Sequence, residues 1–156
     1  MKKFVTAVFI LLLAGSVNLF AFGIGVQGGF GVGDHSGGGA AVTFKVDSLP
    51  YIFAVNASFG SDNTFIGASA DYWLVNKNFA GPLNYFFGAG VGAGIGFGDD
   101  FCFNAAFRIP IGINAFFVNN FIEPYLQLVP EVGISVLPSL GLHWNIGANL
   151  GIRFWL

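Results

Sequence analysis

The sequence predicts an all-β protein: an eight-stranded antiparallel up-and-down transmembrane β-barrel, preceded by an N-terminal signal peptide helix. Charged residues make up 9% of the 156 residues, against about 25% in soluble domains. The 24 glycines disfavour helices, because glycine costs about 1 kcal/mol in a helix interior. In hydrocarbon every backbone polar group needs a partner within the protein, so a chain that spans a membrane without helices must close into a barrel.

The N-terminal segment has the pattern of an export signal. Lys2 and Lys3 precede an apolar run over residues 4–14, which corresponds to the basic and apolar regions of a signal peptide. We therefore place a signal peptide at residues 1–21 and the barrel at residues 22–156, and we expect export to the bacterial outer membrane. An uncleaved anchor helix is the alternative.

Large apolar residues alternate with small or polar ones over residues 22–32. Ile24 and Val26 share one parity, and Gly25 and Gln27 share the other. This period indicates a strand with one face toward lipid and one toward a lumen. The same alternation recurs in seven further segments, namely residues 40–46, 51–59, 65–74, 83–97, 101–117, 122–134 and 140–156. Eight strands is an even number, as single-chain bacterial barrels prefer.

The segments between the predicted strands contain turn residues. These connections are residues 33–39, 47–50, 60–64, 76–82, 98–100, 118–121 and 135–139. If both termini lie on the periplasmic side, the odd connections face outward, and they carry Asp34, Asp62, Asp99 and Asp100. This acidic rim either binds divalent cations that bridge to anionic lipid or consists of ordinary solvated turn residues.

Two prolines fall inside predicted strands, at Pro110 and Pro130. Proline cannot donate a ladder hydrogen bond, and a closed barrel has no free edge. We therefore predict bulges or strand ends at both positions.

Aromatic side chains gather near both ends of the predicted strands, as in the aromatic girdles of membrane barrels. The girdle is predicted to contain Tyr51, Tyr72, Tyr85, Trp144 and Phe154. These residues predict contact with the lipid of the outer membrane.

Three basic and three acidic residues have the inward parity. They are Lys45, Asp71, Arg108, Glu123, Glu131 and Arg153. The interior of an eight-stranded barrel is just wide enough for side chains to fill, so we predict an ion-pair network there. Neutralising Arg108 should destabilise the barrel, because removing one partner of a buried pair costs about 3–5 kcal/mol.

The inward glycines leave room that inward aromatic residues can fill. These aromatic residues are Phe65, Trp73, Phe86, Phe116, Tyr125 and Trp155. We therefore expect a lumen that is mostly filled by side chains. A cavity for a small apolar ligand and a narrow ion path are the alternatives.

The alternating strands, the aromatic girdles and the C-terminal residues 152–156 resemble the small OmpA/OmpX-type family of outer-membrane barrels. The resemblance covers residues 22–156. It implies that the barrel-assembly machinery reads the last strand during insertion. Members of the family typically end on an aromatic residue, whereas this chain ends on Leu156, with Phe154 two places earlier.

These observations predict a monomeric, non-enzymatic barrel with a structural role in the envelope. The alternative is a narrow low-conductance channel or small-solute conduit. A third possibility is a lipid-modifying enzyme that uses His35 and His143 near the outer rim.

Several other classes of function find no support in the sequence. After removal of Lys2 and Lys3, four of the six basic residues remain beside eight acidic ones. This balance does not suggest nucleic acid as a partner, because nucleic acid needs a basic face. We expect no cofactor and no metal site, because the two histidines and Cys102 are far apart in sequence. The segment 23–28 matches G-x-G-x-x-G, but no helix is expected after it, so we dismiss a dinucleotide site.

Overall fold

The computed structural model describes residues 21–156, with the exception of residues 35, 61–62, 99–100 and 138. The predicted signal peptide therefore lies outside the described residues, apart from Ala21. Within the described part of the chain, no helix is long and apolar enough to cross a membrane. The regular structure there consists of β-strands, which confirms the predicted all-β class.

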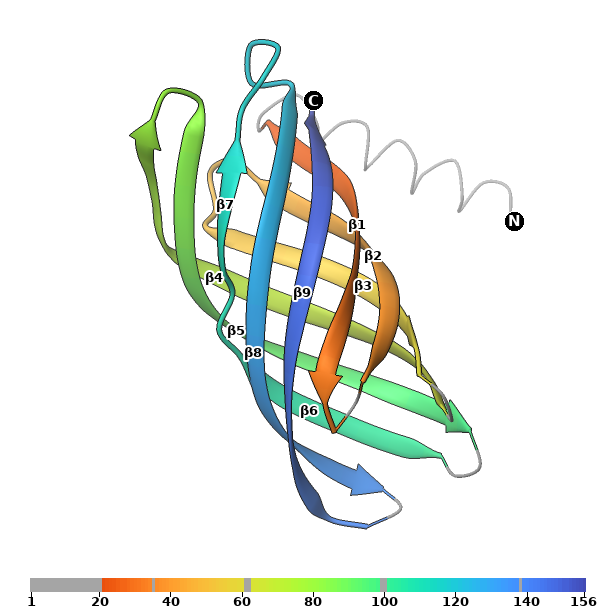
Figure 1. Cartoon of the computed structure of the whole chain (residues 1–156). Helices are drawn as coiled ribbons and strands as arrows, with labels where there is room; N and C mark the ends of the chain where they lie inside the picture. Colours follow the sequence, from red (N-terminus) through yellow and green to blue (C-terminus); the bar gives the residue numbers. More distant parts are fainter. Residues whose placement is uncertain (1–20, 35, 61–62, 99–100, 138) are drawn as a thin grey trace, which may run out of the picture.

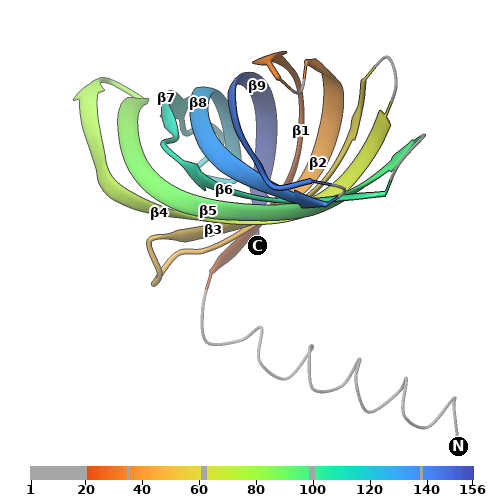
Figure 2. The ribbon, with the colours of Figure 1, turned by 90° about the horizontal axis from the view of Figure 1, so that it is seen from below.

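The described residues form nine antiparallel strands in one closed ring (Figure 1). In chain order they are β1 (Phe22–Gly33), β2 (Gly37–Val46), β3 (Tyr51–Phe59), β4 (Asn63–Ala80), β5 (Leu83–Gly98), β6 (Cys102–Arg108), β7 (Ile111–Ala115), β8 (Ile122–Leu137) and β9 (Gly141–Trp155). β1 pairs with both β2 and β9, and β4 pairs with β5, so the sheet closes on itself. Figure 2 shows how strongly the sheet curves.

β6 and β7 are two parts of one crossing, interrupted at Pro110. Their register against β5 is continuous, since Gly90 pairs with Arg108 and Phe87 with Ile111, three residues further along each strand. The amide of Gly88 still donates to the carbonyl of Pro110 at 2.9 Å, but proline has no N–H to return the bond. The barrel therefore has the eight predicted crossings, and the strand end predicted at Pro110 is present.

The prediction of a bulge or strand end at Pro130 was wrong. β8 runs through this residue, which pairs with Ile146 of β9 in unbroken register. The carbonyl of Pro130 accepts a hydrogen bond from Ile109 at 2.9 Å. Only the return bond is lost at a proline, and the ladder on the β9 side holds the strand in place.

The hairpin of β4 and β5 is longer than the sequence suggested, because residues 76–80 continue β4 and are not part of a connection. A register shift between Trp73 and Val75 marks a bulge at which the predicted strand ended. Beyond it the turn is closed by Asn78, whose amide nitrogen donates to the carbonyls of Gly81 and Leu83 at 2.7 and 2.9 Å. Gly81 has a φ of 54°, a conformation that glycine adopts readily.

The two ends of the barrel differ in what they carry. Phe22 and Leu156 exchange backbone hydrogen bonds of 3.3 and 2.9 Å, so the start of β1 and the end of β9 lie together at one end, here the terminus end (Figure 1). The turns after β2, β4 and β7 lie at this end as well. The opposite end carries the connections after β1, β3, β5 and β8 and is called the loop end.

Side chains alternate between the outside and the inside of the ring. On the outside, Val26 and Leu150 expose 56% and 65% of their surface, whereas Thr43 and Arg153 inside expose 1% each. This arrangement is the reverse of a soluble protein, which covers its apolar residues. An apolar outer wall around a polar interior is the arrangement of a barrel that spans a lipid bilayer.

Candidate functional site: the lumen of the barrel

The half of the lumen nearest the terminus end is filled with side chains. The rings of Trp73 and Phe86 are stacked, with centroids 4.1 Å apart and planes inclined by 13°. Ile52 and Tyr125 pack with them, and all four residues are buried. We call these four residues the aromatic plug.

Glycines on neighbouring strands provide the space for this plug. A Cβ atom added at Gly112 would collide with the ring of Phe86, and one added at Gly151 would collide with the ring of Tyr125. Phe86 and Tyr125 thus each occupy space beside a residue that has no side chain. Part of the glycine content of the sequence is explained by this packing.

An ion pair lies beside the plug, fully removed from water. The Nη1 atom of Arg153 donates to Glu123 Oε2 at 2.7 Å. Asn114 donates to Glu123 Oε1 at 2.7 Å, and the indole nitrogen of Trp155 donates to Oε2 at 2.8 Å. The side chains of Arg153 and Glu123 are 1% and 0% exposed. Burial of Glu123 is tolerated because it has an opposite charge and two further hydrogen-bond donors as partners. The Nε atom of Arg153 is buried without a hydrogen-bond partner in the described structure.

Lys45 belongs to the same region but makes a different kind of contact. Its ammonium group lies 5.5 Å from the ring centroid of Trp73 and 5.0 Å from that of Trp155. Both distances are within the range of a cation–π interaction. The guanidinium group of Arg153 lies 4.8 Å from the ring centroid of Tyr125, so two cations are held partly by aromatic faces.

The remaining three charges form a second cluster further along the axis. Arg108 donates from Nε to Asp71 Oδ1 at 3.0 Å and from Nη1 to Glu131 Oε1 at 3.1 Å. The side chains of Arg108, Asp71 and Glu131 are 14%, 9% and 21% exposed. The structure therefore divides the six predicted lumen charges into two clusters, where the sequence suggested one network.

The separation of the clusters follows from strand geometry. Glu123 and Glu131 lie eight residues apart on β8, which corresponds to about 26 Å of strand at about 3.3 Å per residue. Residue parity shows that both side chains face inward, but it does not show their height along the barrel.

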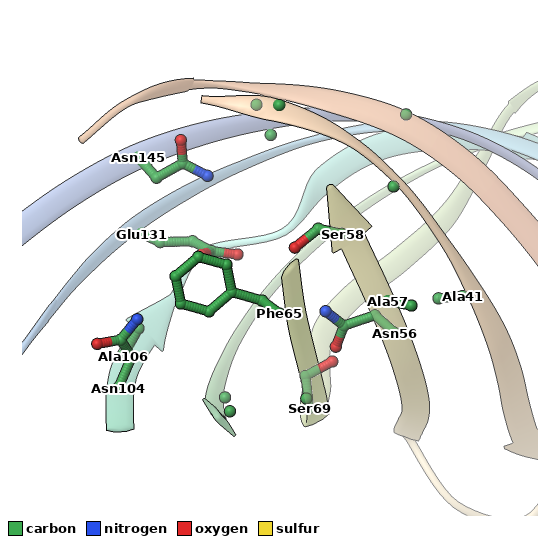
Figure 3. A pocket seen from close by; sticks show the side chains of 18 of the residues that line it. Ala41, Asn56, Ala57, Ser58, Phe65, Ser69, Asn104, Ala106, Glu131 and Asn145 are labelled. Atoms are coloured by element: carbon green, nitrogen blue, oxygen red, sulfur yellow. The ribbon is translucent and has the colours of Figure 1, made fainter. Parts of the chain in front are cut away.

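The half of the lumen nearest the loop end is hollow. A cavity of about 380 Å³ lies there, bounded by Gln27, Ser69 and Arg108 toward the plug and by Asp34 and Gly60 toward the loop end. A side-chain-filled lumen thus describes only the terminus-side half. Figure 3 shows Asn56, Ser58, Phe65, Asn104, Glu131 and Asn145 around this space.

The cavity exists because most inward aromatic residues lie at the other end. Trp73, Phe86 and Tyr125 form the plug, and the rings of Phe116 and Trp155 lie 6.2 Å apart beside it. Of the inward aromatic residues that the sequence identified, Phe65 lines the cavity. Residue parity shows that these side chains face inward. Their positions along the strands show at which end of the lumen they lie, and the sequence analysis did not use those positions.

The predicted girdle residues lie on the outer surface. Tyr51 and Tyr72 are in contact there, with ring centroids 5.0 Å apart, and Tyr85 and Phe154 are also exposed toward the terminus end. Trp144 is exposed near the loop end, where its backbone amide donates to Asp34 Oδ2 at 2.9 Å.

The other candidate residues near the loop end are only partly within the described structure. Asp62, Asp99, Asp100 and His35 lie outside the described residues. Among those described, no group of three or more His, Cys, Asp or Glu side chains is placed to hold a metal ion. His143 is buried, with its Nδ1 3.4 Å from the hydroxyl oxygen of Ser135.

These features define a class of protein: a closed, membrane-spanning β-barrel with a polar lumen. No protein-family model and no curated protein matches the sequence. The structure is similar to the crystal structure of Neisserial surface protein A (NspA), with a TM-score of 0.60 and 13% identity over 86% of this chain and 96% of that chain. A major outer membrane protein from Thermus thermophilus matches with a TM-score of 0.48 and 12% identity over 89% of this chain and 100% of that chain.

At 13% identity, the likeness to NspA establishes the fold. The fold is that of the outer-membrane β-barrels. It confirms, at the level of architecture, the resemblance that the alternating strands and girdles suggested.

Proposed function

We propose that this chain is a non-conducting, non-enzymatic barrel of the bacterial outer membrane with a structural role in the envelope. The observation that carries the proposal is the closed terminus-side half of the lumen. There Phe86 of the aromatic plug is 1% exposed, and the side chains of Arg153 and Glu123 are 1% and 0% exposed. An ion that crossed this region would have to leave its water, which is very costly in a medium of low dielectric constant.

The alternative, a low-conductance channel or small-solute conduit, has one observation in its favour. The cavity at the loop end provides half of a path across the barrel. The other half would open only if the stacked rings of Trp73 and Phe86 separated.

Planar-bilayer recording of the refolded mature chain distinguishes the two functions. We expect a silent membrane from the native chain and discrete current steps from a double variant, Trp73→Ala with Phe86→Ala, which removes the stacked rings. The matched control is Phe87→Ala, because Phe87 neighbours Phe86 but lies on the outer surface; it should stay silent. Discrete steps from the native chain would establish conduction and overturn the proposal.

The proposal includes export by the signal peptide, insertion by the barrel-assembly machinery, contact with membrane lipid and a monomeric state. The apolar outer wall and the exposed tyrosines support the contact with lipid. Fractionation of cell envelopes, combined with heat-modifiable migration on a gel, tests location and folding together. Recovery of the folded chain in the soluble fraction would contradict this part of the proposal.

The structural role predicts a phenotype that does not depend on the lumen. Cells that lack the chain should become more permeable to detergents and large antibiotics. Expression of either the native chain or Phe87→Ala should restore the barrier. If His143→Ala failed to restore it and also altered the lipids of the outer leaflet, the enzymatic alternative would replace the structural one.

A further inference from the structure

The cavity at the loop end has the size of a ligand site and a mouth on one side. Its volume of about 380 Å³ falls within the range of about 300–1,000 Å³ that is usual for small-molecule sites. Asp34, Ser36 and Gly60 surround the mouth. Gln27 forms part of the floor and accepts a hydrogen bond from the hydroxyl of Tyr125 in the plug at 3.0 Å.

The polar groups of the wall are mostly neutral carboxamides and hydroxyls. They belong to Gln27, Ser36, Asn56, Ser58, Ser69, Asn104, Asn145 and Asn149, and the imidazole of His143 also lines the cavity. Each carboxamide offers two N–H donors and one carbonyl acceptor, and each hydroxyl offers both roles. An apolar ligand would strip water from these groups without replacing its hydrogen bonds, which is unfavourable.

The charges in the wall do not favour an anion. Arg108 is the one Lys or Arg side chain among the described residues that line the cavity. Its Nε, Nη1 and Nη2 atoms are directed at the carboxylates of Asp71 and Glu131, at distances of 3.0, 3.1 and 3.4 Å. Arg108, Asp71 and Glu131 together carry a net charge of −1, and Asp34 adds a further carboxylate at the mouth, so the charges around the cavity repel an anion.

One aromatic face complements the amides. Figure 3 shows the ring of Phe65 in the space between Asn56, Ser58, Asn104 and Glu131. A flat apolar ring beside polar side chains suits a ligand that has C–H groups on its faces and hydroxyls at its edge. A sugar ring has this distribution, and each of its hydroxyls both donates and accepts, as the surrounding amides do.

We propose that the loop-side cavity binds a small neutral carbohydrate, the size of a monosaccharide or disaccharide. The site does not require a path through the plug, so the proposal is independent of whether the lumen conducts. The sugar is either free or the headgroup of a glycolipid near the mouth, since both present the same hydroxyl chemistry.

The test uses the refolded mature chain in an amine-oxide detergent, because glucoside and maltoside detergents carry sugars themselves. Saturation-transfer NMR with glucose, galactose and maltose should show saturable binding. Choline and acetate should show none. Nanodiscs with and without a galactosyl lipid distinguish the two sources of the sugar. If the lipid competes with free galactose, the site binds a lipid headgroup. If the lipid does not compete, the site binds free sugar.

Two variants and one control locate the site. Asn56→Leu removes an amide at similar size and should weaken binding about tenfold, as expected for the loss of about one hydrogen bond. Gly147→Trp should abolish binding, because Gly147 lines the cavity and the nearest atom to an added Cβ is Asn149 Nδ2 at 3.5 Å. Val55→Ala alters the outer face beside Asn56 and should bind normally. All variants are first checked for folded migration on an unheated gel.

Three results would overturn the proposal. They are the absence of saturable binding by every sugar tested, binding of choline in place of the sugars, and undiminished sugar binding by folded Gly147→Trp.

Discussion

The two halves of this barrel are built from the same strands, but the terminus-side half is packed with side chains and the loop-side half contains a cavity. In the terminus-side half, the inward glycines lie beneath the rings of Phe86 and Tyr125, and the charges of Glu123 and Arg153 are sealed from water. In the loop-side half, Gly147 has no bulky neighbour, and the side chain of Glu131 remains 21% exposed. Strand alternation decides only which residues face inward. The height at which the large ones occur decides whether the lumen is packed or open.

This contrast predicts that equivalent substitutions have unequal costs in the two halves. A buried charge that loses its partner has no water to replace it, whereas a charge beside a cavity has. Removing one contact should therefore destabilise the terminus-side half more than the loop-side half.

The largest difference is expected between two glutamates of β8. Glu123→Gln leaves Arg153 buried without a counter-charge and should cost about 3–5 kcal/mol of unfolding free energy. Glu131→Gln leaves Arg108 paired with Asp71 and should cost about 1 kcal/mol or less. Urea unfolding in lipid vesicles, followed by tryptophan fluorescence, measures both. Equal losses would contradict the division of the lumen into a dry and a wet half.

A second test concerns Arg108, which holds two carboxylates together. Arg108→Met leaves Asp71 and Glu131 without their cation, and we expect a loss of about 2 kcal/mol, below the usual cost of breaking a fully buried pair because the cavity supplies water. Adding Glu131→Gln to Arg108→Met should recover part of this loss by removing one of the two like charges. Heat resistance on a gel and the urea midpoint report the effect. No recovery in the double variant would show that the carboxylates do not repel each other.

The sequence predicted the ring but not the axial arrangement inside it. Alternation identified all eight crossings and the inward parity of Asp71 and Glu123, because a one-residue step always changes the face. It could not show that these two side chains belong to separate clusters, since height depends on the stagger between paired strands. The continuation of β4 to Ala80 was also hidden, because a bulge after Trp73 interrupts the pattern by one residue.

Two inward glycines of β9 provide a matched pair for testing the packing. A methyl group at Gly151 would collide with the ring of Tyr125, and Gly151→Ala should cost about 1–3 kcal/mol, the usual cost of overpacking. At Gly147 the nearest atom to an added Cβ lies at 3.5 Å, so Gly147→Ala should change stability by less than about 0.5 kcal/mol. The same urea unfolding experiment measures both variants. A loss at Gly147 as large as that at Gly151 would mean that the cavity is packed in solution.

The smallest expected effect lies at the boundary between the halves and reports whether the cavity holds water. The hydroxyl of the buried residue Tyr125 donates to Gln27 Oε1 at 3.0 Å, and Gln27 lines the cavity. Tyr125→Phe removes this bond and the 3.4 Å hydrogen bond between the same hydroxyl and Thr43 Oγ1, while Gln127 still donates to Gln27 Oε1 at 3.4 Å. The loss costs about 0.5–1.5 kcal/mol when the groups left behind stay buried and dry. If water fills the cavity, it can donate to Gln27 in place of the hydroxyl, and we expect a loss at the lower limit of that range. Tyr85→Phe, at an exposed tyrosine on the outer wall, is the control and should have almost no effect. A loss at the upper limit for Tyr125→Phe would indicate a dry cavity, in which the carboxamides of the wall would have to be satisfied by one another.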